Sequence, residues 1–232
     1  MSIMSNNKKI VISLGGSIMI PQEPNISFLS DFVSLIKNYV EQGYSFCIIT
    51  GGGKTARVYQ DALREVADLS AQTIDWMGIY STRLNAQLLR MLFEDYAHDA
   101  VVWHPFPFEE IDSPVVVGAG HEPGNSSDMG AVIAAKDLGA SRVINLSNID
   151  YVYESDPRKD SNAKKFEELD WSSYLDIIPK EWTPGMSSPF DPVASRFAQK
   201  NDIEVAIING ENLSSLQKYI EGKDFEGTRM YG

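Results

Sequence analysis

Cysteine is nearly absent from this chain of 232 residues, since Cys47 is the only one. A single cysteine excludes a disulfide within the chain and a metal site built from several cysteines. Cys47 lies in an apolar segment, which indicates a small buried side chain. The three histidines, His98, His104 and His121, do not have the spacing of metal ligands, so we predict no metal-binding side chains.

Long apolar runs and positive charge are scarce as well. No segment approaches the about 20 apolar residues that cross a membrane, and the first nine residues lack the apolar core of a secretory signal. We therefore expect a cytoplasmic protein with no membrane partner. The net charge of -12 argues against nucleic acid as a partner. An anionic ligand must be held by a local group of cations, because the overall field repels it.

Short runs rich in Val and Ile alternate with amphipathic stretches. We predict strands at residues 9–14, 45–50, 100–104, 114–118, 142–147 and 203–208. We predict helices at residues 27–42, from the glycines after residue 50 to about 68, and at 77–97, 127–138, 192–200 and 213–220. This alternation predicts an α/β fold with a mostly parallel sheet covered on both faces. We expect a single domain over residues 1–232, with the loop at 182–192 as a candidate lid.

Glycine turns follow the first two predicted strands. One is Gly15-Gly16-Ser17, and the other is the run from Gly51 to Arg57, Gly-Gly-Gly-Lys-Thr-Ala-Arg. Bare backbone N–H groups and a helix N-terminus suit a phosphate, and Lys54 and Arg57 add two full charges. Ligands of open α/β sheets collect at the carboxyl ends of the strands. The two turns therefore predict one phosphate chain held from both sides, or two phosphate-bearing ligands.

Two common glycine motifs do not fit the second turn. The Walker pattern requires a glycine five residues before its Gly-Lys pair, where this chain has Ile48. The dinucleotide fingerprint requires a further strand ending in an acid about 20 residues on. The segment 69–78 does not have the pattern of such a strand.

Three more polar segments lie near predicted strand ends. The loop at 118–128 contains three glycines and a proline, and Ser126, Ser127 and Asp128 are candidate N-caps of the next helix. Another polar turn spans residues 145–157. Asp75 stands just before a long predicted helix, where it would cap the helix or accept hydrogen bonds from sugar hydroxyls.

Taken in order, these motifs resemble the amino-acid kinase superfamily, and most closely its uridylate (UMP) kinases of the archaeal type. The matching segments are 14–17, 51–57, 75–85, 126–128, 148–160 and 191–192. The resemblance implies a three-layer α/β sandwich with an acceptor half at about 1–140 and an ATP half at about 141–232. It implies transfer of the ATP γ-phosphate to UMP with Mg²⁺, in a homo-oligomer, most often a hexamer.

The resemblance also assigns residues by position. Residues that would bind ATP are Gly15, Gly16, Gly53, Arg57, Ser147, Tyr153 and Asp156. Residues that would bind UMP are Gly52, Asp75, His121, Glu122, Pro123, Gly124, Asn125, Ser126 and Ser127. The catalytic residues would be Lys54, Arg57 and Asp128. Asp75 would hold the ribose hydroxyls, and Asp128 would orient catalytic groups.

Two departures leave a second hypothesis open. Ser13 stands where many relatives have lysine, and Tyr151 stands where they have glycine. We expect Lys54 to supply the charge missing at Ser13. The alternative is a non-catalytic relative of the same fold that binds a nucleotide or an oxoanion for storage or sensing. An isopentenyl-phosphate kinase would have histidine where Arg57 and Tyr59 stand, and a carboxylate kinase would not need the segment that begins at Asp75.

Overall fold

A seven-stranded sheet forms the centre of the computed structural model, which describes residues 8–108, 111–160, 162–180 and 188–232. Its strands run in the order β3 (Val115–Gly118), β2 (Ser45–Thr50), β1 (Lys9–Leu14), β4 (Arg142–Ser147), β8 (Glu204–Asn209), β9 (Thr228–Tyr231) and β7 (Glu168–Asp170). The first five strands are parallel, and β9 runs antiparallel to β8. A separate hairpin joins β5 (Val152–Tyr153) to β6 (Lys165–Phe166).

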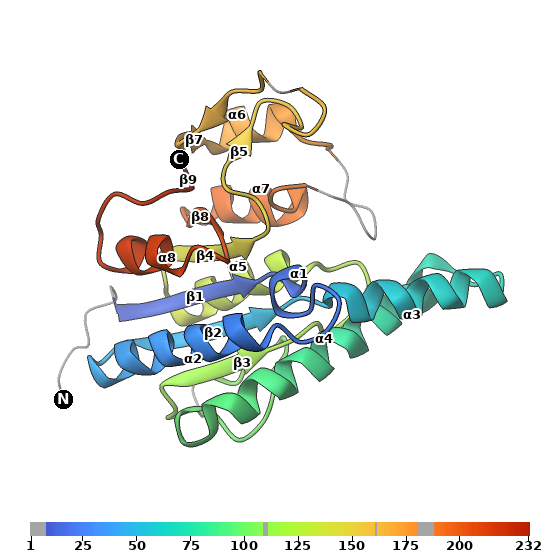
Figure 1. The fold of residues 1–232 in the computed structure, drawn as a ribbon, viewed down its shortest axis with the longest axis horizontal. Helices are drawn as coiled ribbons and strands as arrows, with labels where there is room; N and C mark the ends of the chain where they lie inside the picture. The colour runs from blue at the N-terminus through green and yellow to red at the C-terminus, as the bar shows by residue number, and fades with distance from the viewer. Residues whose placement is uncertain (1–7, 109–110, 161, 181–187) are drawn as a thin grey trace.

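Helices cover both faces of this sheet (Figure 1). On one face the core packs side chains of α1 (Gly16–Met19), α2 (Ile26–Glu41), α4 (Ala71–Phe93) and α8 (Leu213–Ile220). On the other face it packs α5 (Ser127–Leu138), α6 (Trp171–Ile177) and α7 (Pro192–Lys200). Alternate residues of each strand enter the two cores, as Ile12 and Val11 do in β1. The predicted three-layer α/β fold is confirmed.

The helix α3 (Gly53–Val66) follows the second glycine turn and projects away from the sheet (Figure 1). The helix α4 returns alongside it and then packs beneath the sheet. A short 3-10 turn, η2 (Glu94–Tyr96), ends this helix. No helix in the described ranges is long and apolar enough to cross a membrane.

Two elements differ from the prediction. The expected strand at 100–104 is wrong: only Val102 forms an isolated bridge, to Gly118. Pro105 and Pro107 have no N–H to extend a ladder at this edge. The helix expected at 77–97 begins at Ala71, and the Ser70 side chain caps it by accepting a hydrogen bond from the Thr73 N–H at 3.1 Å.

The short elements between residues 148 and 180 and at the C-terminus were not predicted. Strands of two to four residues, such as β5 and β9, are too short to give a periodic pattern. Most of the candidate lid at 182–192 lies outside the described residues. The boundary between an acceptor half and an ATP half at about residue 140 stays a prediction.

Candidate functional site

The two glycine turns pack backbone against backbone at the carboxyl ends of β1 and β2. A Cβ added to Gly16 would lie 2.1 Å from the Gly53 nitrogen, and one added to Gly51 would lie 2.5 Å from the Gly16 nitrogen. Gly53 also has a φ of 62°, which side chains disfavour. Only glycine therefore allows the two turns to meet.

Several N–H groups at this junction are unpartnered. Gly15 donates to the Leu146 carbonyl at 2.8 Å, and Gly51 donates to the Leu14 carbonyl at 2.9 Å. The N–H groups of Gly16, Ser17, Gly52 and Gly53 have no hydrogen-bond acceptor among the described residues. Because buried N–H groups normally find a partner, this cluster suits an anion.

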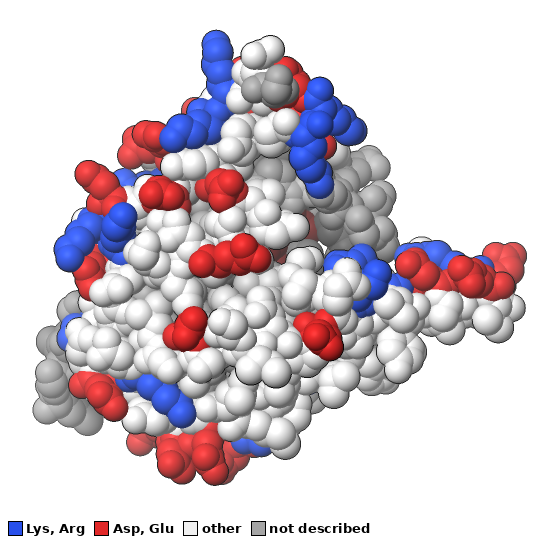
Figure 2. All heavy atoms as spheres, in the orientation of Figure 1, with Lys and Arg blue, Asp and Glu red and all other residues white. Residues whose placement is uncertain are grey.

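Two cations flank these turns. The Lys54 side chain is half-buried, and Arg57 is exposed with a guanidinium nitrogen 3.5 Å from the Ser17 hydroxyl. Neither forms an ion pair within the described part of the chain. Figure 2 shows basic atoms gathered where α3 meets the body of the molecule. This local charge is what an anionic ligand of an acidic protein requires.

Asp128 lies at the start of α5 and receives three hydrogen bonds. The Ser13 hydroxyl and the Asn145 amide donate to its Oδ1 at 2.9 and 2.7 Å, and the Asp191 N–H donates to its Oδ2 at 3.1 Å. Burial raises the pKa of the Asp128 carboxyl to about 6, against the opposite effect of these hydrogen bonds. The carboxyl is therefore protonated more readily than an exposed aspartate.

The N-cap of α5 is Ser126, whose hydroxyl oxygen accepts from the Met129 N–H at 3.1 Å. Of the three cap candidates in the sequence, Ser127 and Asp128 instead lie in the first turn of the helix. Asp128 is thus free to face Ser13 and Asn145.

The loop predicted to bind UMP lies against α4. Asp75 Oδ2 accepts from the Gly124 N–H at 2.8 Å. Arg83 donates to the Gly120 carbonyl at 3.1 Å and to the His121 carbonyl at 3.3 Å, and its guanidinium stacks 4.3 Å from the centre of the Trp103 ring. Asp75 is inside the helix, so its interpretation as a cap is wrong. The structure brings Asp75 together with the 121–127 loop.

The residues predicted to bind ATP are less closely grouped. Ser147 follows Leu146, which binds Gly15, and so lies beside the first glycine turn. Tyr153 lies in the β5–β6 hairpin. Asp156 forms an ion pair with the exposed Arg158 at 3.0 Å, and this contact lowers the pKa of Asp156. Among the described residues, no hydrogen bond joins Tyr153 or Asp156 to the glycine turns.

Sequence analysis missed the polar residues in the middle of α4. Thr82 accepts from the Gly120 N–H at 2.9 Å through its hydroxyl, and from the Thr50 hydroxyl at 3.0 Å through its carbonyl. Asn85 donates to the Gly51 and Gly52 carbonyls. The sequence does contain a signal for Asn85, since it stands four residues before Leu89 and is therefore a polar residue on the apolar stripe of the helix.

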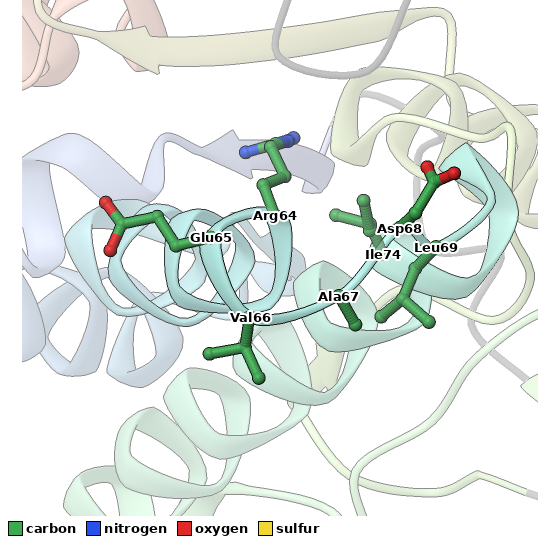
Figure 3. A pocket seen from close by; sticks show the side chains of 7 residues that line it. All are labelled: Arg64, Glu65, Val66, Ala67, Asp68, Leu69 and Ile74. Atoms are coloured by element: carbon green, nitrogen blue, oxygen red, sulfur yellow. The ribbon is translucent and has the colours of Figure 1, made fainter.

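Two hollows lie away from this site. One, of about 330 Å³, is at the turn between α3 and α4, where Ile74 lies near Leu69 and Glu65 points away (Figure 3). The other, of about 380 Å³, lies near the C-terminus and includes Arg142 and Glu204. Neither contains a predicted site residue.

The side chains around the glycine turns determine how a metal ion could be held there. Within the described residues, no group of three or more His, Cys, Asp and Glu side chains is placed to hold a metal ion. Mg²⁺ usually takes one or two carboxylates together with substrate phosphates and water. Both Asp128 oxygens already accept hydrogen bonds from Ser13, Asn145 and Asp191, so the site fits Mg²⁺ that arrives with a nucleotide and is held mainly by its phosphates and water.

Comparison with known proteins agrees with this arrangement. A uridylate kinase from Pyrococcus abyssi is 33% identical over 226 residues, which cover 96% of this chain and 99% of the relative. A uridylate kinase from Methanocaldococcus jannaschii is 32% identical over 229 residues, which cover 94% of this chain and 100% of the relative.

Solved structures extend the comparison to the fold. The crystal structure of uridylate kinase from Archaeoglobus fulgidus has a TM-score of 0.80 at 31% identity, covering 96% of this chain and 99% of that one. The UMP kinase from Bacillus anthracis, at 19% identity and a TM-score of 0.76, shares the fold. A profile of the amino acid kinase family matches residues 8–209. The chain therefore belongs to the amino acid kinase family.

Proposed function

We propose that this protein transfers the γ-phosphoryl group of ATP to UMP, giving ADP and UDP. The observation that carries the proposal is the contact between the two glycine turns, with unpartnered N–H groups at Gly16, Ser17, Gly52 and Gly53. Full-length relatives named uridylate kinase, at 31–33% identity, support UMP as the acceptor.

The mechanism follows from the charges of the reactants. A phosphate oxygen of UMP is already nucleophilic, so it attacks the γ-phosphorus without a general base, and the bond to the ADP oxygen breaks. Such a reaction needs two anions aligned and the developing charge stabilised. The N–H groups of the turns, Lys54 and Arg57 supply that stabilisation, and Asp128 orients catalytic groups.

Bound Mg²⁺ would neutralise charge on the ATP phosphates. We propose that Ser147, Tyr153 and Asp156 contact the adenosine, and that Gly15, Gly16 and Gly53 contact its phosphates. Gly52, Asp75 and residues 121–127 would bind UMP. The hydrogen bond from the Gly124 N–H to Asp75 supports this assignment, because the Asp75 carboxylate then lies beside the 121–127 loop.

We also propose a homo-oligomer, with a hexamer as the expected form, and a cytoplasmic location. The outer face of α4 supports association, because Tyr80, Leu84 and Met91 are 56%, 62% and 60% exposed. A helix that is apolar on both faces requires a second partner besides its own sheet.

The test is a coupled assay of ADP formation with a panel of acceptors. It should include UMP, CMP, AMP, acetylglutamate and isopentenyl phosphate. We expect the highest kcat/KM with UMP. Equal turnover of a carboxylate or an isoprenoid phosphate would contradict the proposal. Binding of an ATP analogue without turnover of any acceptor would favour the non-catalytic alternative.

A further inference from the structure

Asn85 is a buried amide in the middle of α4. The residue is 2% exposed and lies on the stripe of α4 that includes Ser81, Leu89 and Phe93. Burying an amide in such a stripe is unfavourable unless the amide is hydrogen-bonded. Its bonding partners therefore indicate why it is tolerated.

Those partners are the carbonyls of the second glycine turn. Asn85 Nδ2 lies 2.8 Å from the Gly51 oxygen and 3.1 Å from the Gly52 oxygen. An amide nitrogen has two hydrogens, so it can donate to each carbonyl. Glycine has no side chain to fix its peptide planes. The bond from Asn85 supplies that restraint at the Gly51 carbonyl, and at the Gly52 carbonyl it adds to the hydrogen bond from the Ala56 N–H at 3.2 Å.

The orientation of each carbonyl determines the orientation of the next N–H. In a planar trans peptide the C=O and the N–H point in opposite directions. Because the Gly51 carbonyl points towards α4, the Gly52 N–H in the same peptide points away from α4. In the next peptide the Gly52 carbonyl points towards α4, so the Gly53 N–H also points away from this helix. Both of these N–H groups are without an acceptor among the described residues.

We propose that Asn85 is a positioning residue that aims the Gly52 and Gly53 N–H groups at a bound phosphate. This inference rests on the proposed function and deepens it by assigning the residue that shapes the phosphate turn. The same helix holds the acceptor loop through Asp75. Asn85 therefore also fixes the phosphate turn relative to the acceptor.

The test compares Asn85→Leu with Gln87→Leu, which also replaces an amide by leucine on α4 but at a side chain that does not touch the glycine turn. Binding of Mg²⁺-tripolyphosphate and of uridine is measured by calorimetry, and kcat is measured with ATP and UMP. For Asn85→Leu we expect about tenfold weaker tripolyphosphate binding and at least about tenfold lower kcat, with uridine affinity within about twofold. Gln87→Leu should match the unmodified protein in all three.

Asn85→Asp gives a second, nearly isosteric variant. An ionised carboxyl cannot donate, whereas a protonated one donates once, so tripolyphosphate binding relative to the unmodified protein should recover as the pH falls. Unchanged tripolyphosphate binding in folded Asn85→Leu would overturn the proposal, as would an equal loss of uridine. If Asn85→Leu and Asn85→Asp both failed to fold, the proposal would be overturned and Asn85 would have a purely structural role. If the unmodified protein phosphorylated no acceptor, the proposed function would be contradicted. The tripolyphosphate and uridine binding measurements would still test whether Asn85 positions the glycine turn.

Discussion

The Asp128 carboxyl combines a raised pKa with hydrogen bonds from three separate segments, through Ser13, Asn145 and Asp191. Its folded pKa of about 6 exceeds the ordinary value of 3.8 because burial disfavours the charged form. The protonated carboxyl therefore stabilises the fold. That stabilisation is fully present below the ordinary pKa and is lost as the pH rises through about 6.

Replacing Asp128 by Asn should remove this pH dependence. Between pH 4.5 and 7.5 the free energy of unfolding of the unmodified protein should fall by about 2 kcal/mol relative to Asp128→Asn. Urea titrations of both proteins at several pH values measure the difference. A constant difference across this range would show that Asp128 does not titrate there.

Lys54 is the residue that we expect to replace the cation absent at Ser13. In the proposed mechanism each cation beside the phosphates has a large effect on the transition state, because the protein has a net charge of -12. Lys54→Ala should lower kcat by about 10²–10³, with a smaller change in KM. Steady-state kinetics measure both constants, and the exposed Lys218→Ala on α8 serves as the control.

A second substitution tests whether a lysine at position 13 and Lys54 contact the same phosphates. Ser13→Lys in the Lys54→Ala background should restore part of kcat, because Ser13 already contacts Asp128 beside the first glycine turn. If Lys54→Ala changes kcat only a few-fold, the charge must come from Arg57 or from another cation.

At the scale of elements, α4 connects the two halves of the site. It contacts the loop predicted to bind UMP through Asp75 and Arg83, and it contacts the second glycine turn through Asn85. In the proposed mechanism this one helix sets the separation between acceptor and donor. Small shifts of this helix are expected to affect kcat, because phosphoryl transfer depends on alignment.

Asp75→Asn separates the two roles of Asp75 in this helix. An amide oxygen can still accept from the Gly124 N–H, but the negative charge that we propose faces the ribose is lost. We expect weaker UMP binding by roughly 1.5–3 kcal/mol, and a smaller loss with dUMP, which lacks one hydroxyl. KM and Kd for both nucleotides provide the measurement. Equal losses would mean that Asp75 acts only on the loop.

At the scale of the whole molecule, the exposed apolar side chains of α4 predict association between copies. Leu84→Glu together with Tyr80→Glu should lower the molar mass in solution, because two charges would be buried in an apolar contact. Light scattering after gel filtration measures the mass. Ile26→Glu, at a 79% exposed apolar residue on α2, is the control and should leave the mass unchanged. An unchanged mass in the double variant would place the interface elsewhere.

Local patterns were sufficient for the main elements of the fold. The strands at 9–14, 45–50 and 142–147 match the structure residue by residue, since buried parallel strands are continuous apolar runs. The glycine turns were also evident locally, because a turn that approaches a ligand needs glycine wherever it occurs. The family followed from several such motifs in order.

Contacts between distant residues could not be derived in this way. Asp128 accepts a hydrogen bond from Ser13, 115 residues away, and Gly51 is restrained by Asn85, 34 residues away. The raised pKa of Asp128 comes from burial by such distant segments. The segment at 100–104 has the composition of a strand, yet only Val102 pairs with the edge strand β3. Pro105 and Pro107, which follow it, have no N–H to continue the pairing. The tertiary structure decided the pKa of Asp128, the contact of Asn85 and the pairing at 100–104. The physical reason is that burial and hydrogen bonding depend on which residues are neighbours in space, and the sequence alone does not give those neighbours.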